Sequence, residues 1–197
     1  MQLANQREVP DEEKSPPIHT ALIDSIFEAS GPLLAGLVFA AIAASLTALK
    51  TGSDLIWGCV ALLIVTGAVR AFDLQRYQAR KSTVTADESA RWQKRYQIGA
   101  MVQAAAIGLW CSITLLSTDD AVAHMIALSV TTGLAAGGAG RAYGRQWIFQ
   151  LQVTLIFGPT VLALALRGTP YYVAMSVVSA VFLVTLMRIS ATLHRIF

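Results

Sequence analysis

Six long apolar stretches constrain this chain more than any other feature of its sequence. A bilayer core about 30 Å thick needs roughly 20 apolar residues in a helix, and each stretch meets or approaches that length. Only 14% of the 197 residues are charged, whereas soluble domains carry about 25%. We therefore predict an all-α, polytopic bundle of six transmembrane helices, with spans at residues 31–49, 55–72, 96–116, 121–138, 147–166 and 171–187.

The connections between these spans predict how the helices pair. KTGSD, STDD and RGTP follow the first, third and fifth spans, and such short connections allow only antiparallel hairpins. The one long connection, 73–95, is charged and favours helix. Its TADE sequence, residues 85–88, matches the capping box that begins a helix.

The basic residues divide unevenly between the two ends of the predicted helices. Of the fifteen Lys and Arg residues, only Lys50 and Arg167 lie on the side of the three short connections. Because cytosolic loops are rich in Lys and Arg, we expect both termini to be cytosolic. The same division explains the pI near 9.1, since the cations would face anionic membrane lipids. We therefore expect no nucleic-acid partner.

The two ends of the chain differ from the six spans. Residues 1–17 are polar and contain proline, which predicts a disordered cytosolic tail. Residues 18–30 carry apolar side chains at helical spacing and predict an amphipathic helix that lies in the interface; packing on the cytosolic end of the bundle is the alternative. These precede the membrane domain proper, 31–187.

Residues 188–197 continue the sixth span without Gly or Pro. We expect them to begin a connector helix toward a cytosolic domain. The apolar residues of this region have the spacing of a coiled-coil seam, which predicts a homodimer formed through Leu186, Ile189, Leu193 and Ile196.

A glycine-rich stretch, SVTTGLAAGGAGRAYGR at 129–145, closes the fourth span. It is not a Walker phosphate loop, because the Lys and Ser/Thr of that motif are missing. We predict that its small residues pack against the fifth span. The alternative is an unwound helix end that binds a lipid headgroup or a small carboxylate. The candidate residues are Gly133, Gly137, Gly138, Gly140, Arg141, Tyr143, Arg145 and Gln150.

His124 is the only histidine within a span, about one turn from Asp119 and Asp120. Histidine titrates near neutral pH, so these three residues are a candidate extracytosolic sensing cluster. The plainer interpretation is an interfacial histidine beside carboxylates that cap a helix.

Motifs for catalysis and for metal binding are missing from the sequence. It has no HExxH and no GxSxG, so we expect neither an enzyme nor a cofactor. Cys59 and Cys111 lie far apart within apolar runs, and we predict buried small hydrophobic residues rather than a disulfide or a metal site.

The glycine-rich stretch, the QLQ and GTPYY that follow, and the terminal RISATLHRIF together resemble one family. They are similar to the N-terminal six-helix membrane domain of bacterial GGDEF–EAL signalling proteins, which make or degrade cyclic di-GMP. That family commonly has Asn after the Arg of the turn, where this chain has Ala142. Neither a GGDEF nor an EAL motif occurs in these residues, so no catalytic residue carries over.

The resemblance implies a multi-pass domain of the bacterial inner membrane. It would sense or anchor, and would relay a signal through its last helix to a fused cytosolic cyclase or phosphodiesterase. Two alternatives are a small transporter or channel-like protein and a structural subunit of a larger membrane complex.

Overall fold

All six predicted spans form helices. A computed structural model describes residues 30–80, 86–139 and 146–196, and these form six α-helices and no strand. The helices are α2 (Ser30–Thr51), α3 (Asp54–Arg80), α4 (Ala86–Ser117), α5 (Ala121–Ala139), α6 (Gln146–Leu166) and α7 (Pro170–Ile196). Each contains a stretch long and apolar enough to cross a bilayer. The predicted all-α, six-helix membrane bundle is confirmed.

The predicted tail at 1–17 lies outside the described residues. So does the predicted amphipathic helix at 18–30, except for its last residue, which begins α2.

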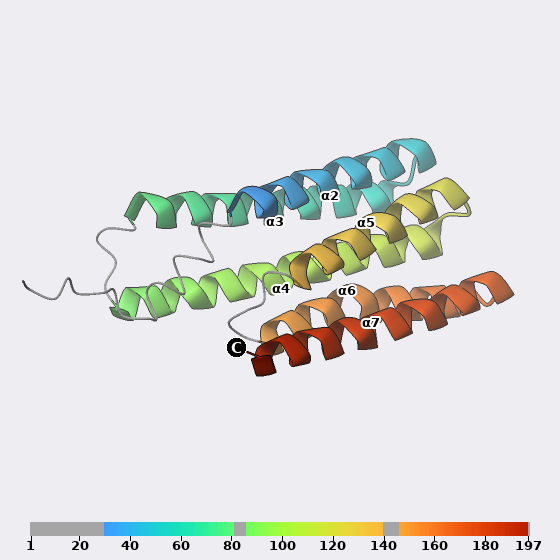
Figure 1. Ribbon diagram of the computed structural model, residues 1–197. Helices are drawn as coiled ribbons and strands as arrows, with labels where there is room; N and C mark the ends of the chain where they lie inside the picture. Colours follow the sequence, from blue (N-terminus) through green and yellow to red (C-terminus); the bar gives the residue numbers. More distant parts are fainter. Residues whose placement is uncertain (1–29, 81–85, 140–145, 197) are drawn as a thin grey trace, which may run out of the picture.

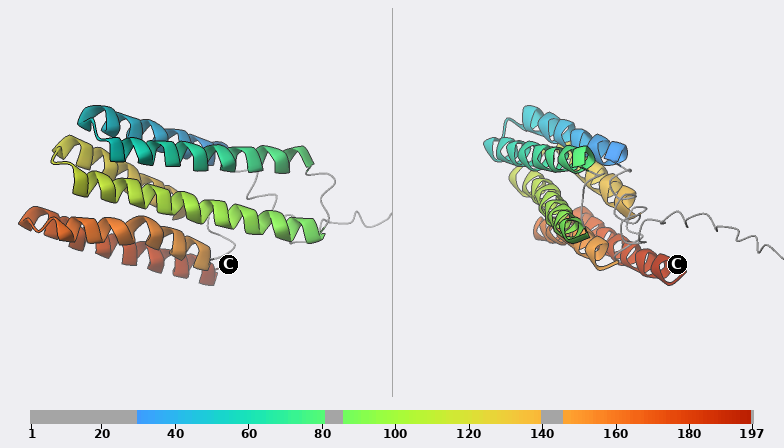
Figure 2. Two further views of the ribbon diagram at one scale, coloured as in Figure 1. Left: turned by 180° about the vertical axis from the view of Figure 1, so that it is seen from behind. Right: turned by 90° about the vertical axis from the view of Figure 1, so that its left-hand side faces the viewer.

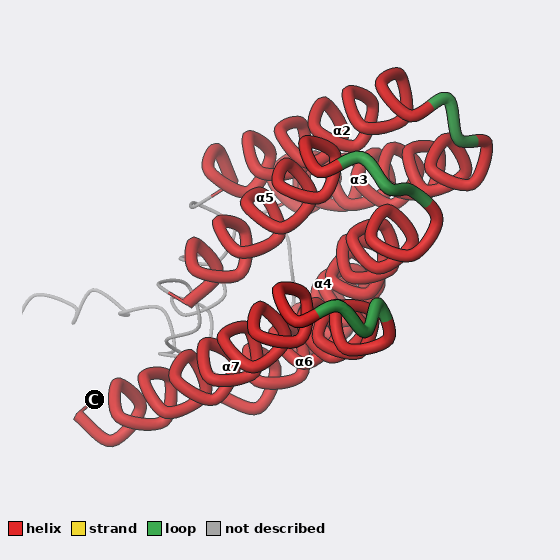
Figure 3. The backbone as a smooth tube through the Cα atoms, turned by 90° about the vertical axis from the view of Figure 1, so that its right-hand side faces the viewer, coloured by secondary structure: helices red, strands yellow, loops and turns green. Residues whose placement is uncertain are grey.

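The helices pair as three antiparallel hairpins, whose turns at 52–53, 118–120 and 167–169 lie at one end of the bundle, here named the hairpin end (Figures 1 and 3). Gly52 and Gly168 have φ of 64° and 70°, a left-handed conformation that glycine adopts without strain. Each follows the close of a helix, and the N–H of Gly52 donates to the carbonyl of Ala48 at 2.9 Å. Glycine in this position is a common helix stop.

α4 is the central helix, with α3, α5 and α6 packed around it. Within its apolar span 61% of the residues are buried, against 17% in α7. Figure 3 shows α4 between the α2–α3 and α6–α7 hairpins. We predicted that the glycine-rich fourth span, which is α5, packs against the fifth span, which is α6, but α6 is not its main neighbour. α6 packs chiefly on α4 and α7, whereas α5 packs chiefly on α4 and α2.

Gly108 explains why α6 lies against α4. A Cβ at this position would lie 2.4 Å from the carbonyl oxygen of Leu155 and 2.9 Å from that of Ile156, so only glycine permits this approach. Pro159 lies inside α6 and has no N–H to donate to the carbonyl four residues earlier. The Leu155 carbonyl is therefore free to turn toward the Gly108 backbone.

Buried polar side chains join α2 to α4 within the core. Trp110 is fully buried, and its Nε1–H donates to the Thr47 hydroxyl at 3.2 Å. That hydroxyl donates to the carbonyl of Ala44 at 2.8 Å, so the contact leaves no unpaired polar atom. Cys59 and Cys111 are buried free thiols, as predicted.

The end opposite the hairpin turns is named the basic end. It holds the last turns of α3 and the first turns of α4, including Arg70, Arg76 and Arg95. Here α3 and α4 extend beyond the other helices (Figures 1 and 2).

Candidate functional site

His124 lies in the first turn of α5 and is 3% exposed, with both ring nitrogens bonded. Its Nε2 is 3.0 Å from the carbonyl oxygen of Thr118 and 3.2 Å from the hydroxyl of the same residue. A carbonyl oxygen can only accept, which assigns the ring hydrogen to Nε2. The Nδ1 atom then accepts from the Tyr172 hydroxyl of α7 at 2.6 Å.

Arg167 lies beside this histidine, in the turn between α6 and α7. Its Nε donates to the Leu115 carbonyl at 2.6 Å, its Nη1 to the Asp119 carboxylate at 2.7 Å, and its Nη2 to the Thr118 carbonyl. Carbonyls at the end of α4 have no partner within the helix, and a cation is favourable there. The guanidinium also lies 5.2 Å from the centre of the Tyr172 ring.

The two acidic residues of the middle turn contact the only two cations that the sequence places at this end. Asp119 pairs with Arg167 at 2.7 Å, and Asp120 pairs with Lys50 at 3.2 Å. Asp120 also accepts from the N–H of Ala123 at 2.8 Å, which caps α5. That bond, reinforced by the Lys50 ammonium, holds the pKa of the Asp120 carboxyl below its usual value.

These contacts make the hairpin end a polar junction, defined by Lys50, Thr118, Asp119, Asp120, His124, Arg167 and Tyr172. The junction joins all three hairpins, because it contains residues of every turn region. No three His, Cys, Asp or Glu side chains of the described ranges lie close enough to hold a metal ion.

The sequence singled out three members of the polar junction, and the structure brings these to one place. Arg167, Tyr172 and Lys50 were missed because more than forty residues separate each of them from the residue that it contacts in the middle turn region. The sequence did contain a feature that could have identified Arg167, since Arg167 is one of only two cations on the side of the three short connections.

The prediction for the glycine-rich stretch fails in its packing. Gly133 and Gly137 are exposed, and a Cβ at either would meet no atom within 4 Å. Of the described candidate glycines, only Gly138 contacts a neighbouring helix, with its Cβ position 3.7 Å from the Phe149 ring of α6.

The buried face of α5 consists of other small residues at four-residue spacing. They are Ala123, Ala127, Thr131 and Ala135, each at most 2% exposed. Gly133 and Gly137 are two residues out of step with that row, which places them on the opposite side of the helix.

Gly140, Arg141, Tyr143 and Arg145 lie outside the described residues. Gln150 is half-buried in α6. Binding of an anionic group at this stretch stays a prediction.

The chain matches no protein-family model, no curated protein and no solved structure.

Proposed function

We propose that this chain is a membrane-embedded sensor or anchoring domain that relays a signal to a cytosolic module through α7. The observation that carries the proposal is the attachment of α7 to the bundle. Among the described helices, α7 contacts only α6 and α5. Beyond α6, its polar link to the bundle is the bond between Tyr172 and His124 of α5.

The length of α7 makes this attachment a means of relay. The helix runs unbroken from Pro170 to Ile196, a distance of about 40 Å. On the α6 side it is held by packing of Phe182 on Phe157 and by the Ser176 hydroxyl, which donates to the Val161 carbonyl at 2.9 Å. A change at Tyr172 would therefore act on the first turn of α7 while these contacts keep α7 paired with α6.

The resemblance to GGDEF–EAL proteins supports a cyclic-di-GMP module as the output, in a multi-pass protein of the bacterial inner membrane. The charge division supports cytosolic termini. Lys50 and Arg167 both belong to the polar junction, while Arg70, Arg76 and Arg95 lie at the basic end.

A homodimer through α7 is part of the proposal. Of the seam that the sequence indicated, only Leu186 is excluded, since Ile189 is 46% exposed and the side chains of Leu193 and Ile196 lie outside the described residues. Leu186 is 5% exposed and packs in the chain's own core, so it cannot pair with a second copy. Val177, Val181 and Val184 are 50–60% exposed at helical spacing. Single cysteines at these positions should form disulfides between copies in membranes, and a cysteine at Leu186 should not.

The relay is tested with one pair of tyrosine variants in a chain that carries a diguanylate cyclase domain after Phe197. Tyr172→Phe removes only the hydroxyl that bonds His124. Tyr171→Phe is the matched control, because Tyr171 is the neighbouring tyrosine and is 84% exposed. We expect Tyr172→Phe to change cellular cyclic di-GMP at least about threefold, since losing one buried hydrogen bond costs about 1 kcal/mol, and Tyr171→Phe to leave it unchanged.

Equal output from both variants and the parent, at equal protein levels, would contradict the relay. A solute flux through vesicles that contain the purified chain would favour the transporter alternative instead.

A further inference from the structure

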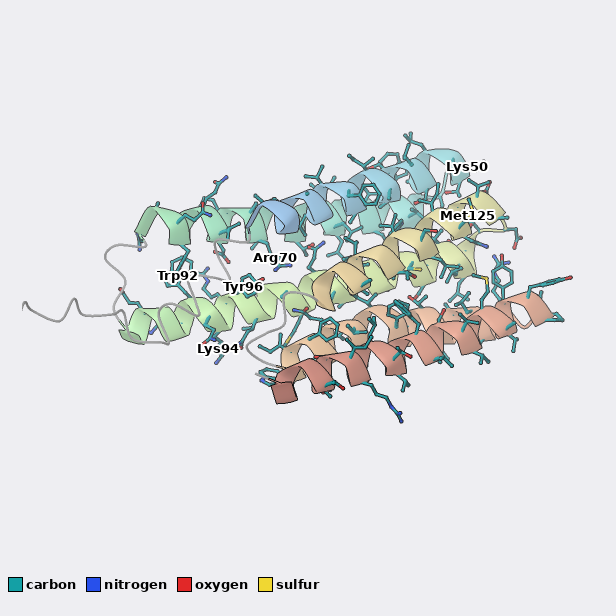
Figure 4. All side chains as sticks on the ribbon, in the orientation of Figure 1. Lys50, Arg70, Trp92, Lys94, Tyr96 and Met125 are labelled. Carbon is teal, nitrogen blue, oxygen red and sulfur yellow. The ribbon has the colours of Figure 1, made fainter. Side chains whose placement is uncertain are left out.

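A cleft of about 340 Å³ opens between α3 and α4 at the basic end. Its apolar wall contains Val65, Val69, Ile98 and Val102, which are 46–60% exposed. Toward the basic end the lining changes to aromatic and charged side chains, which are Trp92, Tyr96, two arginines and one aspartate. In Figure 4, Trp92 and Tyr96 lie between the two helices, whereas Lys94 lies on the other side of α4.

Arg70 belongs to α3, and its side chain extends across the cleft toward α4. Its guanidinium carbon is 5.2 Å from the centre of the Tyr96 ring, a cation–π distance. Its Cγ would lie 3.3 Å from a Cβ at Gly99, so the glycine makes room for the arginine stem. The side chain is half-buried. Arg70 is thus held in place by residues of α4. An arginine that only snorkelled would instead extend its side chain toward the lipid headgroups.

A second arginine lies near the mouth of the cleft, on α4. Arg95 is 5.6 Å from the centre of the Trp92 ring and 3.7 Å from the Asp73 carboxylate. With Arg70 and Asp73, the charged lining of the cleft carries a net charge of one positive unit. Trp92 in turn packs edge-on against the buried Tyr77 at 5.9 Å, which fixes the aromatic wall.

The change from apolar to charged lining along the helices matches the change from acyl chain to headgroup in a phospholipid. Val65 and Arg70 are five residues apart on one helix, which is about 7.5 Å along its axis. A ligand in the cleft would therefore contact aliphatic side chains toward the hairpin end and, toward the basic end, guanidinium groups with aromatic rings beside them. Guanidinium is well suited to phosphate.

We propose that this cleft binds one anionic phospholipid, with an acyl chain along Val65, Val69 and Val102 and the phosphate at Arg70 and Arg95. This site is separate from the polar junction and does not depend on the proposed signalling function.

The test is native mass spectrometry of the full 197-residue chain with phosphatidylglycerol and phosphatidylcholine. We expect one phosphatidylglycerol to be retained more strongly than phosphatidylcholine. Arg70→Gln should weaken that retention about tenfold, as expected for the loss of one charge-assisted hydrogen bond. Arg76→Gln is the matched control, because Arg76 lies on the same helix, stacks on Phe72 at 4.5 Å and does not line the cleft.

Blocking the apolar wall gives an independent measurement. Val102→Trp should lower retention of phosphatidylglycerol, whereas Leu109→Trp, seven residues along the same helix and outside the cleft, should not. Folding of each variant is checked by its melting temperature without added lipid. Arg70→Lys, which keeps the charge, should retain part of the binding if Arg70→Gln melts early.

Three results would overturn the proposal. Equal losses in Arg70→Gln and Arg76→Gln would mean diffuse attraction to the basic end. Equal retention of the two lipids would mean that the cleft does not recognise the headgroup. Binding that requires removal of residues 1–29 would mean that this segment of the chain is the occupant.

Discussion

The two ends of α4 have opposite surroundings, although they belong to one continuous helix. From Gly108 to Ser117 it is enclosed by α6 and by the polar junction, whose hydrogen bonds join all three hairpins. From Arg91 to Val102 it faces α3 across a cleft of about 340 Å³. The hairpin end is closed by specific contacts between turns, and the basic end leaves space for a ligand between two helices.

This contrast teaches that helix pairing in the bundle is not uniform along the membrane normal. In lipid, association depends on packing and on interhelical hydrogen bonds, because the lipid tails are as apolar as the side chains. The bundle is therefore closed where small residues and buried polar partners occur together.

The largest expected effect tests the closed region at Gly108. Gly108→Ala would place a methyl group 2.4 Å from the Leu155 carbonyl oxygen, so α4 and α6 must separate. We expect the free energy of unfolding to fall by about 2–3 kcal/mol, as in overpacked cores. Unfolding in mixed micelles measures it.

Gly137→Ala is the matched control for that substitution. Its new methyl group meets no atom within 4 Å, and alanine is a better helix former by about 1 kcal/mol. We expect unchanged or slightly increased stability. A loss equal to that of Gly108→Ala would restore our original prediction that Gly137 is a packing position.

A smaller effect is expected within the polar junction itself. Arg167→Gln removes the donors to Leu115, Thr118 and Asp119, and the arginine side chain is only 17% exposed. We expect a loss of about 2 kcal/mol, because hydrogen bonds to charged groups are worth about 1.5–3 kcal/mol.

Lys50→Gln removes the other cation of the junction and should cost less than about 1 kcal/mol, since the Lys50 side chain is 44% exposed against 17% for Arg167. Equal losses for Arg167→Gln and Lys50→Gln in the same unfolding assay would show that net charge, rather than the buried carbonyl contacts, closes this end.

The smallest expected effect is the change in the free energy of unfolding when Asp120 is protonated at low pH. The pKa of the Asp120 carboxyl is lowered in the folded chain by the Ala123 N–H and Lys50. Its contribution to stability is therefore complete above the ordinary Asp pKa of about 3.9, and is lost as pH falls through the lowered value. Unfolding measured from pH 6 to 3 should show this loss.

Asp120→Asn isolates that contribution, because asparagine keeps the capping oxygen without the titrating charge. The variant should lose less stability than the parent over the same range of pH. An identical pH dependence in both proteins would assign the acid effect to other carboxyl groups.

The sequence by itself determined the six spans, the three hairpins and the side on which the cations gather. These features depend on the length and hydropathy of each stretch and on the short turns between stretches. They can therefore be predicted without knowing which helices are neighbours. The Gly52 and Gly168 turns are examples, because left-handed backbone requires glycine wherever the chain turns so tightly.

Only the tertiary structure decided which face of each helix packs. A membrane helix is apolar on all sides, so its sequence lacks the polar face that marks the outside of a soluble helix. For that reason Gly133 and Gly137 resembled a packing face, while the actual contacts are made by Gly108 of α4 and by the buried row of small residues on α5 that begins at Ala123. The bond between His124 and Tyr172 likewise depends on how α5 and α7 are placed, because forty-eight residues separate the two side chains.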